Sequence, residues 1–441
     1  MKWILAFLII SLLVLFHEFG HFVVARLNGV IVDEFSLGFG PRLLSAKRGE
    51  TRYSLKLLLF GGSCLMRGMY QYEDEGGDGE EKAPEEGSFP AASVGRRAAI
   101  IFAGPFFNFI LAFLCAIFVI SFMGYDPASI TYVAKDSPAE KAGLKTGDLV
   151  TSFNGDHVDI GRDISAWELL HDYSPDKEIR IRYTRDGESG EAVFYPEVLK
   201  RYMMGLTYTP GDEPAVVQAV HANSPLEEAG VRAGDVITEI DGTAIRTAAE
   251  LNDYFAANPV GADEMVIVID RGGKPYEVKV TPREREDVIT GFAYNMGRTK
   301  TDALGVLKYS FVEVRYWITT TIRSLGAIFT GRFSVNDLSG PVGVADVVGT
   351  TYEESKPDGP FVVLLNMLSL IIFLSADIGV MNLLPLPVLD GGKLLFLLIE
   401  AIRGKPVRQN TEIAIQTATA ILLMALMVYV MYHDLFVLFD R

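Results

Sequence analysis

The chain has 441 residues, 49% of them hydrophobic, and a formal net charge of −16 at pH 7. Residues 126–300 hold 31 acidic against 19 basic side chains, a net charge of −12, residues 71–86 add −7, and the remainder is weakly basic at +3. The absence of a concentrated basic face argues against a nucleic-acid-binding protein, and two cysteines are too few for a disulfide framework.

The first apolar stretch, residues 3–27, is long enough to cross a bilayer and contains the sequence HEFGH. Residues i and i+4 of a helix share one face, so His17 and His21 can bind one metal ion while Glu18 acts as a general base. Ionisable groups inside a lipid-spanning helix are costly. That cost favours a metal site over a cluster of His and Glu that is merely hydrogen-bonded to neighbouring helices.

Three further stretches, 98–123, 361–389 and 412–435, are apolar enough to span a bilayer. The loops between spans one and two and between spans three and four are rich in Arg and Lys, which places both loops in the cytoplasm. The acidic block and both termini would then face outward. Lys2 before an apolar run also fits a signal peptide, but the run has no cleavage site of the A-x-A type, so we expect it to remain uncleaved.

The acidic block contains a duplication. Residues 137–155 and 224–242 are identical at nine of nineteen positions, at a constant offset of 87. Each copy is followed by a helix-like stretch, alternating strands and a short Gly-centred strand, at 203–206 in the first copy and 289–292 in the second. An 87-residue period is too long for a solenoid unit and predicts a duplicated small domain.

The two copies resemble bacterial PDZ domains, in which the A-G-L-x-x-G-D turn is a specific signal. The resemblance implies a groove that binds an extended chain end by strand addition. A folded spacer that binds nothing and only controls access is an equally open reading. Residues 301–334 contain an apolar pattern interrupted by Lys308, Glu313, Arg315 and Arg323, which predicts a partly amphipathic helix lying on or just outside the membrane.

The third span ends in the sequence NLLPLPVLDGG, residues 382–392. A catalytic zinc ion usually has three protein ligands, and Asp390 is the best third candidate because an acid in apolar sequence is costly unless it is paired or metal-bound. An ordinary acid at a helix end is the alternative. Prolines and glycines break the helix here, and irregular backbone at membrane depth is tolerated mainly where it lines a cavity. Asp377, earlier in the span, also needs an interior partner.

HEFGH, the sequence Gly104-Pro-Phe-Phe-Asn108, the PDZ-like repeats and NLLPLPVLDGG together resemble the site-2 protease family, along nearly the whole chain. Specifically, the chain is similar to bacterial regulators of sigma-factor signalling with tandem PDZ domains. The resemblance implies a multi-pass α-helical membrane protein with four transmembrane helices, a site-2 protease fold and two inserted small α+β PDZ domains. It would be a zinc endopeptidase that cleaves transmembrane segments of single-span membrane proteins, such as anti-sigma factors already shortened by another protease, or signal-peptide remnants.

The same resemblance implies a location in the bacterial cell membrane, with the PDZ pair on the outer face and the active site toward the cytoplasm. The expected partners are transmembrane protein substrates, membrane lipid and an upstream protease, and no nucleic acid. The expected domains are residues 1–125 (first membrane part, with a re-entrant β loop at 33–66), 126–209 and 210–297 (PDZ domains), 298–360 (amphipathic juxtamembrane segment) and 361–441 (second membrane part).

Carried over by position, the family's zinc ligands are His17, His21 and Asp390, and its catalytic acid is Glu18. The residues expected to contact substrate or line the site are Asn382, Pro385, Gly61, Gly62 and Asn108, with the two glycines in the re-entrant β element that meets substrate as an extended strand. Two features depart from the family: Asp377 stands where an amide is expected, and 71–86 is an acidic insert, a pattern typical of a solvated loop.

Three other functions are less consistent with the sequence. A non-catalytic PDZ membrane scaffold would have no reason to bury HEFGH and Asp390. An ATP-driven membrane zinc protease would need a G-x-x-x-x-G-K-[ST] loop, which the chain lacks. A PDZ-bearing serine protease would need a Ser/His/Asp set, and the histidines outside the spans have no nucleophile motif near them.

Overall fold

The computed structural model describes residues 2–69, 85–221, 223–334 and 338–440, so most of the acidic insert 71–86 lies outside the described residues. The chain divides into two compact units. Unit 1 comprises residues 1–128, 158–171 and 295–441, and unit 2 comprises residues 129–157 and 172–294. The apolar segments belong to unit 1, and the duplicated sequence belongs largely to unit 2.

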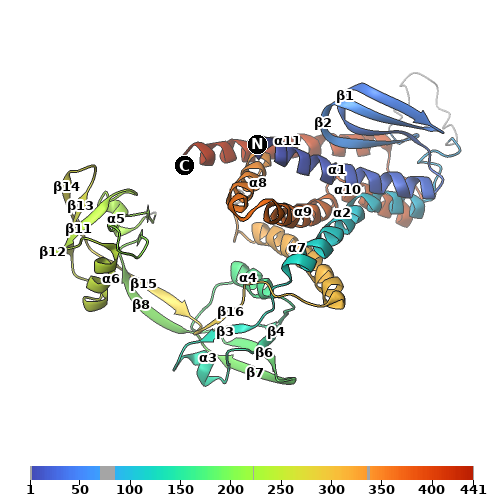
Figure 1. Ribbon diagram of the computed structural model, residues 1–441. Coiled ribbons are helices and arrows are strands. Elements are labelled where there is room, and N and C mark those ends of the chain that lie inside the picture. Colours follow the sequence, from blue (N-terminus) through green and yellow to red (C-terminus); the bar gives the residue numbers. More distant parts are fainter. Residues whose placement is uncertain (1, 70–84, 222, 335–337, 441) are drawn as a thin grey trace. The chain divides into compact units, whose positions relative to one another are not determined.

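Four helices in the described part of unit 1 are long and apolar enough to cross a membrane, at the positions that the sequence predicted. They are α1 (Lys2–Leu27), α2 (Val94–Met123), α9 (Pro360–Asn382) and α11 (Gln409–Asp440). Figure 1 shows α1 and α2 side by side. A Cβ atom on Gly20 would lie 2.4 Å from the carbonyl oxygen of Ala103, so only glycine permits this close helix crossing.

The third apolar stretch is broken at the prolines, as the sequence predicted, and the helix is shorter than the expected span 361–389. Helix α9 ends at Asn382, residues 383–389 form a turn, and α10 (Asp390–Arg403) begins directly after it. Pro385 and Pro387 cause the break, because proline has no amide hydrogen and its ring clashes with the preceding helical turn. Asp390 therefore lies in the first turn of a new helix.

Residues 301–334 contain α7 (Ala303–Phe329), whose amino end is capped by Asp302 through a 2.8 Å bond from the backbone N–H of Gly305. The helix packs against two membrane-capable helices: Val314 shares an apolar cluster with α2, and the ring centroids of Trp317 and Phe373 of α9 lie 4.7 Å apart. It is thus part of the helical core as well as amphipathic. Helices α8 (Pro341–Ser355) and η2 (Lys356–Asp358), which the sequence did not predict, connect it to α9.

Helix α4 (Gly161–Leu170) also belongs to unit 1 and is tied to α7 by a buried charge cluster. The guanidinium of Arg162 lies 2.9 Å from a carboxylate oxygen of Asp126 and 2.5 Å from one of Glu313. Both acids are buried, so each depends on Arg162 for its counter-charge. The cluster fixes the amino half of α7.

Strands β1 (Val32–Arg48) and β2 (Thr51–Met66) fold into a sheet with four segments. Residues 34–37 pair with 62–65 on one side and with 52–55 on the other. Residues 44–48 pair with the free side of 51–55 and form the fourth segment. The rings of Phe35 and Tyr53 lie 5.0 and 5.9 Å from that of Phe22, so one face of the sheet packs on α1. Residues 62–65 form the edge of the sheet.

Unit 2 contains two four-stranded antiparallel sheets with the same topology, in the orders β5-β4-β6-β7 and β12-β11-β13-β14. The first sheet consists of β4 (Leu149–Phe153), β5 (Asp156–His157), β6 (Ile179–Arg185) and β7 (Glu188–Phe194). The second consists of β11 (Val236–Ile240), β12 (Thr243–Ala244), β13 (Met265–Asp270) and β14 (Pro275–Val280). The helices are α3 (Pro138–Lys141), α5 (Pro225–Glu228) and α6 (Ala248–Ala257).

The Gly-centred strands are exchanged relative to the sequence-based assignment. Strand β9 (Leu206–Thr207) pairs with β10 (Ala219–Val220) of the second copy, and β16 (Phe292–Tyr294) pairs with β3 (Ile130–Val133) of the first. The linking strands β8 (Glu197–Met203) and β15 (Arg283–Ile289) pair with each other. The second copy is therefore inserted within the first, which differs from two consecutive domains meeting at residues 209 and 210.

The aspartate of the repeated G-D turn makes the same contacts in both copies. Asp148 and Asp235 are buried, and each accepts a 2.8 Å hydrogen bond from the backbone N–H three residues earlier. Arg185 binds the first at 2.6 Å and Arg271 binds the second at 2.7 Å. The hydrogen bond from Arg271 lowers the pKa of the Asp235 carboxyl below its ordinary value. Each aspartate thus joins its turn to the end of a strand of its own sheet, through Arg185 of β6 or through Arg271 directly after β13.

Replacing Asp235 by Asn should destabilise the second repeat by about 1–3 kcal/mol, because Arg271 loses its ionised acceptor. Hydrogen exchange of the full-length protein should show faster exchange in residues 229–240 and unchanged exchange in the matching segment 142–153. Because the pKa of Asp235 is lowered by folding, its stabilisation is present above the ordinary value of about 3.9 and is lost as the pH falls through the folded value. Equal protection in both proteins would contradict this role.

Candidate metal centre

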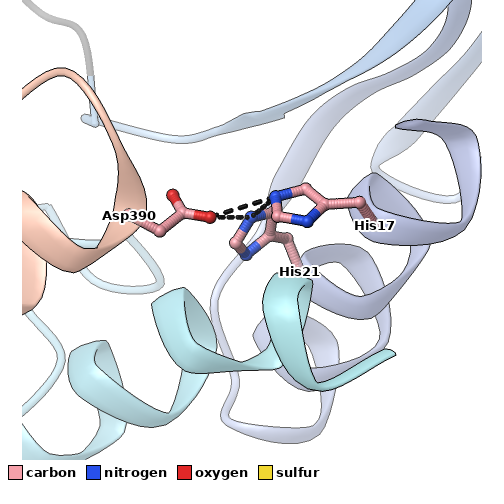
Figure 2. Close-up of side chains that lie close together, drawn as sticks. All are labelled: His17, His21 and Asp390. Carbon is pink, nitrogen blue, oxygen red and sulfur yellow. Dashed lines mark hydrogen bonds and ion pairs between the residues drawn. The ribbon is translucent and has the colours of Figure 1, made fainter. Parts of the chain in front are cut away.

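Helix α1 carries two buried histidines on one face. His17 and His21 are 8% and 7% exposed, and they lie one helical turn apart. Asp390, the first residue of α10, is 7% exposed and faces both imidazoles (Figure 2). A Cβ atom on Gly391 would lie 2.3 Å from two carbonyl oxygens of the preceding turn, so that turn packs directly on the start of α10.

Three donor atoms converge at this point. The Oδ2 atom of Asp390 lies 3.0 Å from Nε2 of His17 and 3.2 Å from Nε2 of His21. The two Nε2 atoms are 3.2 Å apart. Within the described ranges, this is the group of His, Cys, Asp and Glu side chains whose ligand atoms could hold one metal ion. Two imidazoles and one carboxylate are a donor set that catalytic zinc sites use.

Hydrogen bonds on the far side of each ring orient the imidazoles. Nδ1 of His21 lies 2.9 Å from the carbonyl oxygen of Ile100 and therefore carries the proton, which leaves Nε2 free to bind a metal. Nδ1 of His17 lies 3.3 Å from the amide nitrogen of Asn108, whose buried amide oxygen has no partner among the described residues. Exchanging the amide oxygen and nitrogen lets the oxygen accept from Nδ1–H of His17. Both Nε2 atoms are then unprotonated, as metal binding requires.

Helix α2 can approach the two imidazoles only because residue 104 is glycine. A Cβ atom on Gly104 would lie 2.4 Å from Nε2 of His21 and 2.7 Å from Nε2 of His17. Both distances are shorter than any normal contact, so a side chain would displace the metal-binding nitrogens. Gly104 and Asn108 are four residues apart and share one face of α2. The sequence motif that contains them is thus explained by its contact with the histidines.

Glu18 lies between the histidines and the edge of the sheet. A Cβ atom on Gly62 would lie 3.6 Å from Cγ of Glu18, and the backbone N–H of Cys64 donates a hydrogen bond to the Glu18 carboxylate. The strand edge formed by residues 62–65 therefore faces the candidate catalytic acid. The structure brings this predicted element and the HEFGH motif together, as expected from the resemblance.

The remaining predicted residues have other surroundings. The side chain of Asn382 donates to the carbonyl oxygen of Ile378 in its own helix, at 3.0 Å. Pro385 lies in the turn before Asp390. Gly61 has a φ of 73°, a conformation that favours glycine, at the start of the edge segment. Their contacts with substrate stay predictions.

The sequence did not identify three residues that support the cluster. The hydroxyl of Ser375 donates to the backbone carbonyl of Asn108 at 2.8 Å, which joins α9 to the part of α2 that faces His17. The ammonium of Lys393 lies 3.5 Å from the second carboxylate oxygen of Asp390. Ile100 acts through its backbone carbonyl, which no sequence pattern reveals. Only Lys393 carried a signal, namely its i,i+3 spacing from Asp390.

Asp377 has a partner in the structure. Its carboxyl bonds to the hydroxyl of Thr321 of α7. The two side chains line a cavity of about 660 Å³ between α7, α8 and α9, most of whose other lining residues are apolar. Asp377 thus belongs to a cavity wall, which is where an acid in an apolar helix is tolerated.

The family profile and the related sequences point to one family. The sequence profile of peptidase family M50 matches residues 5–426. The chain is 30% identical over 455 residues to the zinc metalloprotease RasP of Bacillus licheniformis, with 99% of each chain covered. It is 31% identical over 471 residues to the regulator of sigma-E protease RseP of Salmonella typhimurium, with 98% of each chain covered.

A solved structure, the HtrA3 PDZ domain bound to a phage-derived ligand, matches 20% of this chain and 92% of its own length. The identity is 20% and the TM-score is 0.17, which is too low to establish a shared fold.

Replacing Asp390 by Ala should abolish stable metal binding, because it removes one of three ligands. The loss in affinity should exceed the roughly 10–100-fold that changes around a ligand typically cause. Elemental analysis of the purified protein measures the bound metal, and Asp358→Ala, an exposed acid, provides the control. Full metal content in the Asp390 variant would show that another residue is the third ligand.

Gly104→Ala should weaken metal binding by about tenfold or more although no ligand is altered, because the new methyl group displaces both Nε2 atoms. Gly95→Ala is the matched control on the same helix, since a Cβ atom there meets no other atom within 4 Å. Metal titration of both variants distinguishes them. Equal affinity for the two would mean that α2 does not pack this closely on the histidines.

Proposed function

Because the chain belongs to peptidase family M50 and is a zinc metalloprotease, we propose that it cleaves the transmembrane segments of single-span membrane proteins within the membrane. The observation that carries the proposal is the convergence of His17, His21 and Asp390 beside helices apolar enough to cross a bilayer. Ionisable groups are retained in such helices for function. Anti-sigma factors already shortened by another protease, and signal-peptide remnants, are the proposed substrates.

The chemistry is peptide hydrolysis with Glu18 as general base and acid. His17, His21 and Asp390 would hold a zinc ion, which would lower the pKa of a water molecule to about 7 and polarise the scissile carbonyl. Glu18 accepts the proton of the attacking water and delivers it to the departing amine. The hydrogen bond from Cys64 and the neighbouring ligands on α1 position its carboxylate for both transfers.

The substrate binds as an extended strand along the sheet edge at residues 62–65. A peptide carbonyl inside an intact helix is occupied by the backbone hydrogen-bond ladder, so the substrate must unwind before water can attack. Residues 62–65 pair on one side with 34–37, and the N–H of Cys64 points to Glu18. A strand added at this edge therefore brings its carbonyl groups to the catalytic acid.

Three further residues complete the proposed substrate site. Asn382 ends α9 and Pro385 lies in the turn that packs on the start of α10, so both border the backbone that carries Asp390. They hold the unwound segment of the substrate. Asn108 lines the site through its contact with His17.

The protein resides in the bacterial cell membrane. All four apolar helices cross it, and the Arg- and Lys-rich loops lie in the cytoplasm, as does the entrance to the site. The duplicated modules are PDZ domains on the outer face, and they either bind the shortened outer end of a substrate or restrict access to the site. An upstream protease supplies that shortened end.

Replacing Glu18 by Gln should leave the bound zinc unchanged and lower the cleavage rate by about a hundredfold or more, because only the proton-transfer group is lost. Zinc content and cleavage of a single-span reporter protein in membranes measure the two effects. Glu354→Gln, an exposed residue of α8, serves as the control. Normal turnover by the Glu18 variant would refute the proposed mechanism.

The same inactive variant tests the substrate class. Single-span membrane proteins should accumulate on Glu18→Gln protein in membranes and should be absent from Asp390→Ala protein, if substrate binding requires an intact metal site. Co-purification followed by identification of the bound chains provides the measurement. Recovery of soluble proteins alone would exclude intramembrane cleavage while leaving the metalloprotease assignment intact.

A further inference from the structure

The outer part of the sheet formed by β1 and β2 places cations directly opposite cations. We call residues 42–58 the outer hairpin. In its register Arg42 is opposite Lys56, and Lys47 is opposite Arg52. Like charges directly opposite each other on neighbouring strands destabilise the pairing. An anion between the two members of each pair would offset this repulsion.

The first pair has its anion within the chain. The guanidinium of Arg42 donates to both carboxylate oxygens of Glu34, each at 2.8 Å. The ammonium of Lys56 lies 3.9 Å from the same carboxylate. The side chain of Glu34 is only 9% exposed, so this acid is a built part of the sheet. The first pair shows how the sheet accommodates opposed cations.

The second pair differs, because Arg52 is also opposite Glu34 but the carboxylate of Glu34 is bonded to Arg42. Neither Lys47 nor Arg52 forms an ion pair within the described ranges, and the guanidinium of Arg52 donates only to the Ser45 hydroxyl, at 3.3 Å. Arg48 adds a third cation next to the pair, and both Lys47 and Arg48 are exposed. Glu50, in the intervening turn, forms no ion pair with them. This end of the outer hairpin therefore presents three cations that form no ion pair with the described residues.

The opposite end of the outer hairpin is apolar and exposed. Its large apolar side chains are more than half exposed, namely Leu43, Leu44, Leu57 and Leu58. Leu58 is opposite Phe39, whose ring lies 3.0 Å from the position of a Cβ atom on Gly61. That position is 3.4 Å from Val14, in the middle of α1. The leucines therefore lie at the depth of the middle of a membrane-capable helix.

The cationic end lies at a different level. Arg52 is next to Tyr53, whose ring lies 5.9 Å from that of Phe22, five residues before the end of α1 at Leu27. Three residues of strand, about 10 Å, separate Leu44 from Lys47. The outer hairpin thus has its apolar end beside the middle of the span and its cations near the carboxyl end of the span, which is the order of acyl chains and headgroups in a bilayer leaflet.

We propose that Lys47, Arg48 and Arg52 bind the phosphate headgroup of an anionic phospholipid, with the leucines of the outer hairpin in the acyl region of the same leaflet. Free phosphate would satisfy the charges but would leave the leucines in water, whereas a phospholipid occupies both ends. The bound headgroup takes the place between Lys47 and Arg52 that Glu34 takes between Arg42 and Lys56. The lipid then anchors the sheet whose other edge, residues 62–65, faces Glu18.

The test uses the full chain in nanodiscs, with Leu44→Trp as a reporter. The fluorescence of the added tryptophan is obtained by subtracting the fluorescence of the unmodified chain from that of the Leu44→Trp variant. Two preparations of phosphatidylcholine discs are compared. One contains a minor fraction of brominated phosphatidylglycerol and the other contains the same fraction of brominated phosphatidylcholine. The brominated chains quench tryptophan on contact. Because each cation near an anionic surface contributes a preference of about fivefold, quenching by the brominated phosphatidylglycerol should exceed that by brominated phosphatidylcholine by at least about threefold.

Lys47→Gln, Arg48→Gln and Arg52→Gln combined should bring this ratio close to one. The matched control is Arg403→Gln, Lys405→Gln and Arg408→Gln, three exposed cations at the end of α10 and in the connection after it, which should keep the full ratio. Unchanged quenching by brominated phosphatidylcholine in all variants shows that the outer hairpin is still folded into the bilayer.

Three results would overturn the proposal. Equal quenching by both brominated lipids would exclude a preference for anionic headgroups. A ratio that survives loss of Lys47, Arg48 and Arg52 would place the preference elsewhere. The quenching ratio can also be measured in inorganic phosphate and in chloride at the same ionic strength. A ratio that falls to one in phosphate but not in chloride would assign the site to free phosphate instead of lipid.

Discussion

The structure depends on holding three ionisable side chains together in apolar surroundings. His17 and Asp390 are 373 positions apart in sequence, and their facing atoms are 3.0 Å apart. Such groups are tolerated beside lipid only when they bind each other or a metal, so α1 and α10 must meet with little freedom. The tight turn that ends at Asp390 and the glycine contact of Gly104 both serve this requirement. Two imidazoles and a carboxylate that converge in this way form a set of ligands for a metal ion.

The same requirement organises the neighbouring helices. His17 contacts Asn108 of α2, and the backbone of Asn108 accepts a hydrogen bond from Ser375 of α9, so one line of polar contacts joins the three helices. On the other side, Glu18 accepts from the backbone of Cys64 at the sheet edge. The candidate catalytic acid therefore lies between the helical core and the sheet edge at residues 62–65, which is the proposed binding edge for an extended substrate. The outer hairpin at the opposite side of that sheet is where lipid would hold it.

Much of this arrangement was predictable because its signals are local. Apolar runs predicted the membrane-capable helices, the i,i+4 spacing of HEFGH predicted the paired imidazoles, and an offset of 87 predicted the duplication. The family comparisons confirmed the zinc metalloprotease. The third span was predicted too long, because hydropathy averages over Pro385 and Pro387, whereas the backbone responds to each proline. The Gly-centred strands were assigned to the wrong copies, since strand pairing is a long-range choice that sequence order does not reveal.

The sequence by itself determined which residue types are available to bind a metal, because HEFGH in an apolar helix and an acid after a broken span have few other physical explanations. It also determined the acidic repeats and the position of the cationic loops. Only the tertiary structure decided that Gly104 must lack a side chain, that Asn108 orients His17, and that Lys47 and Arg52 face each other without a carboxylate between them among the described residues. The reason is that each of these depends on distances between segments far apart in the chain, which packing sets and local sequence does not.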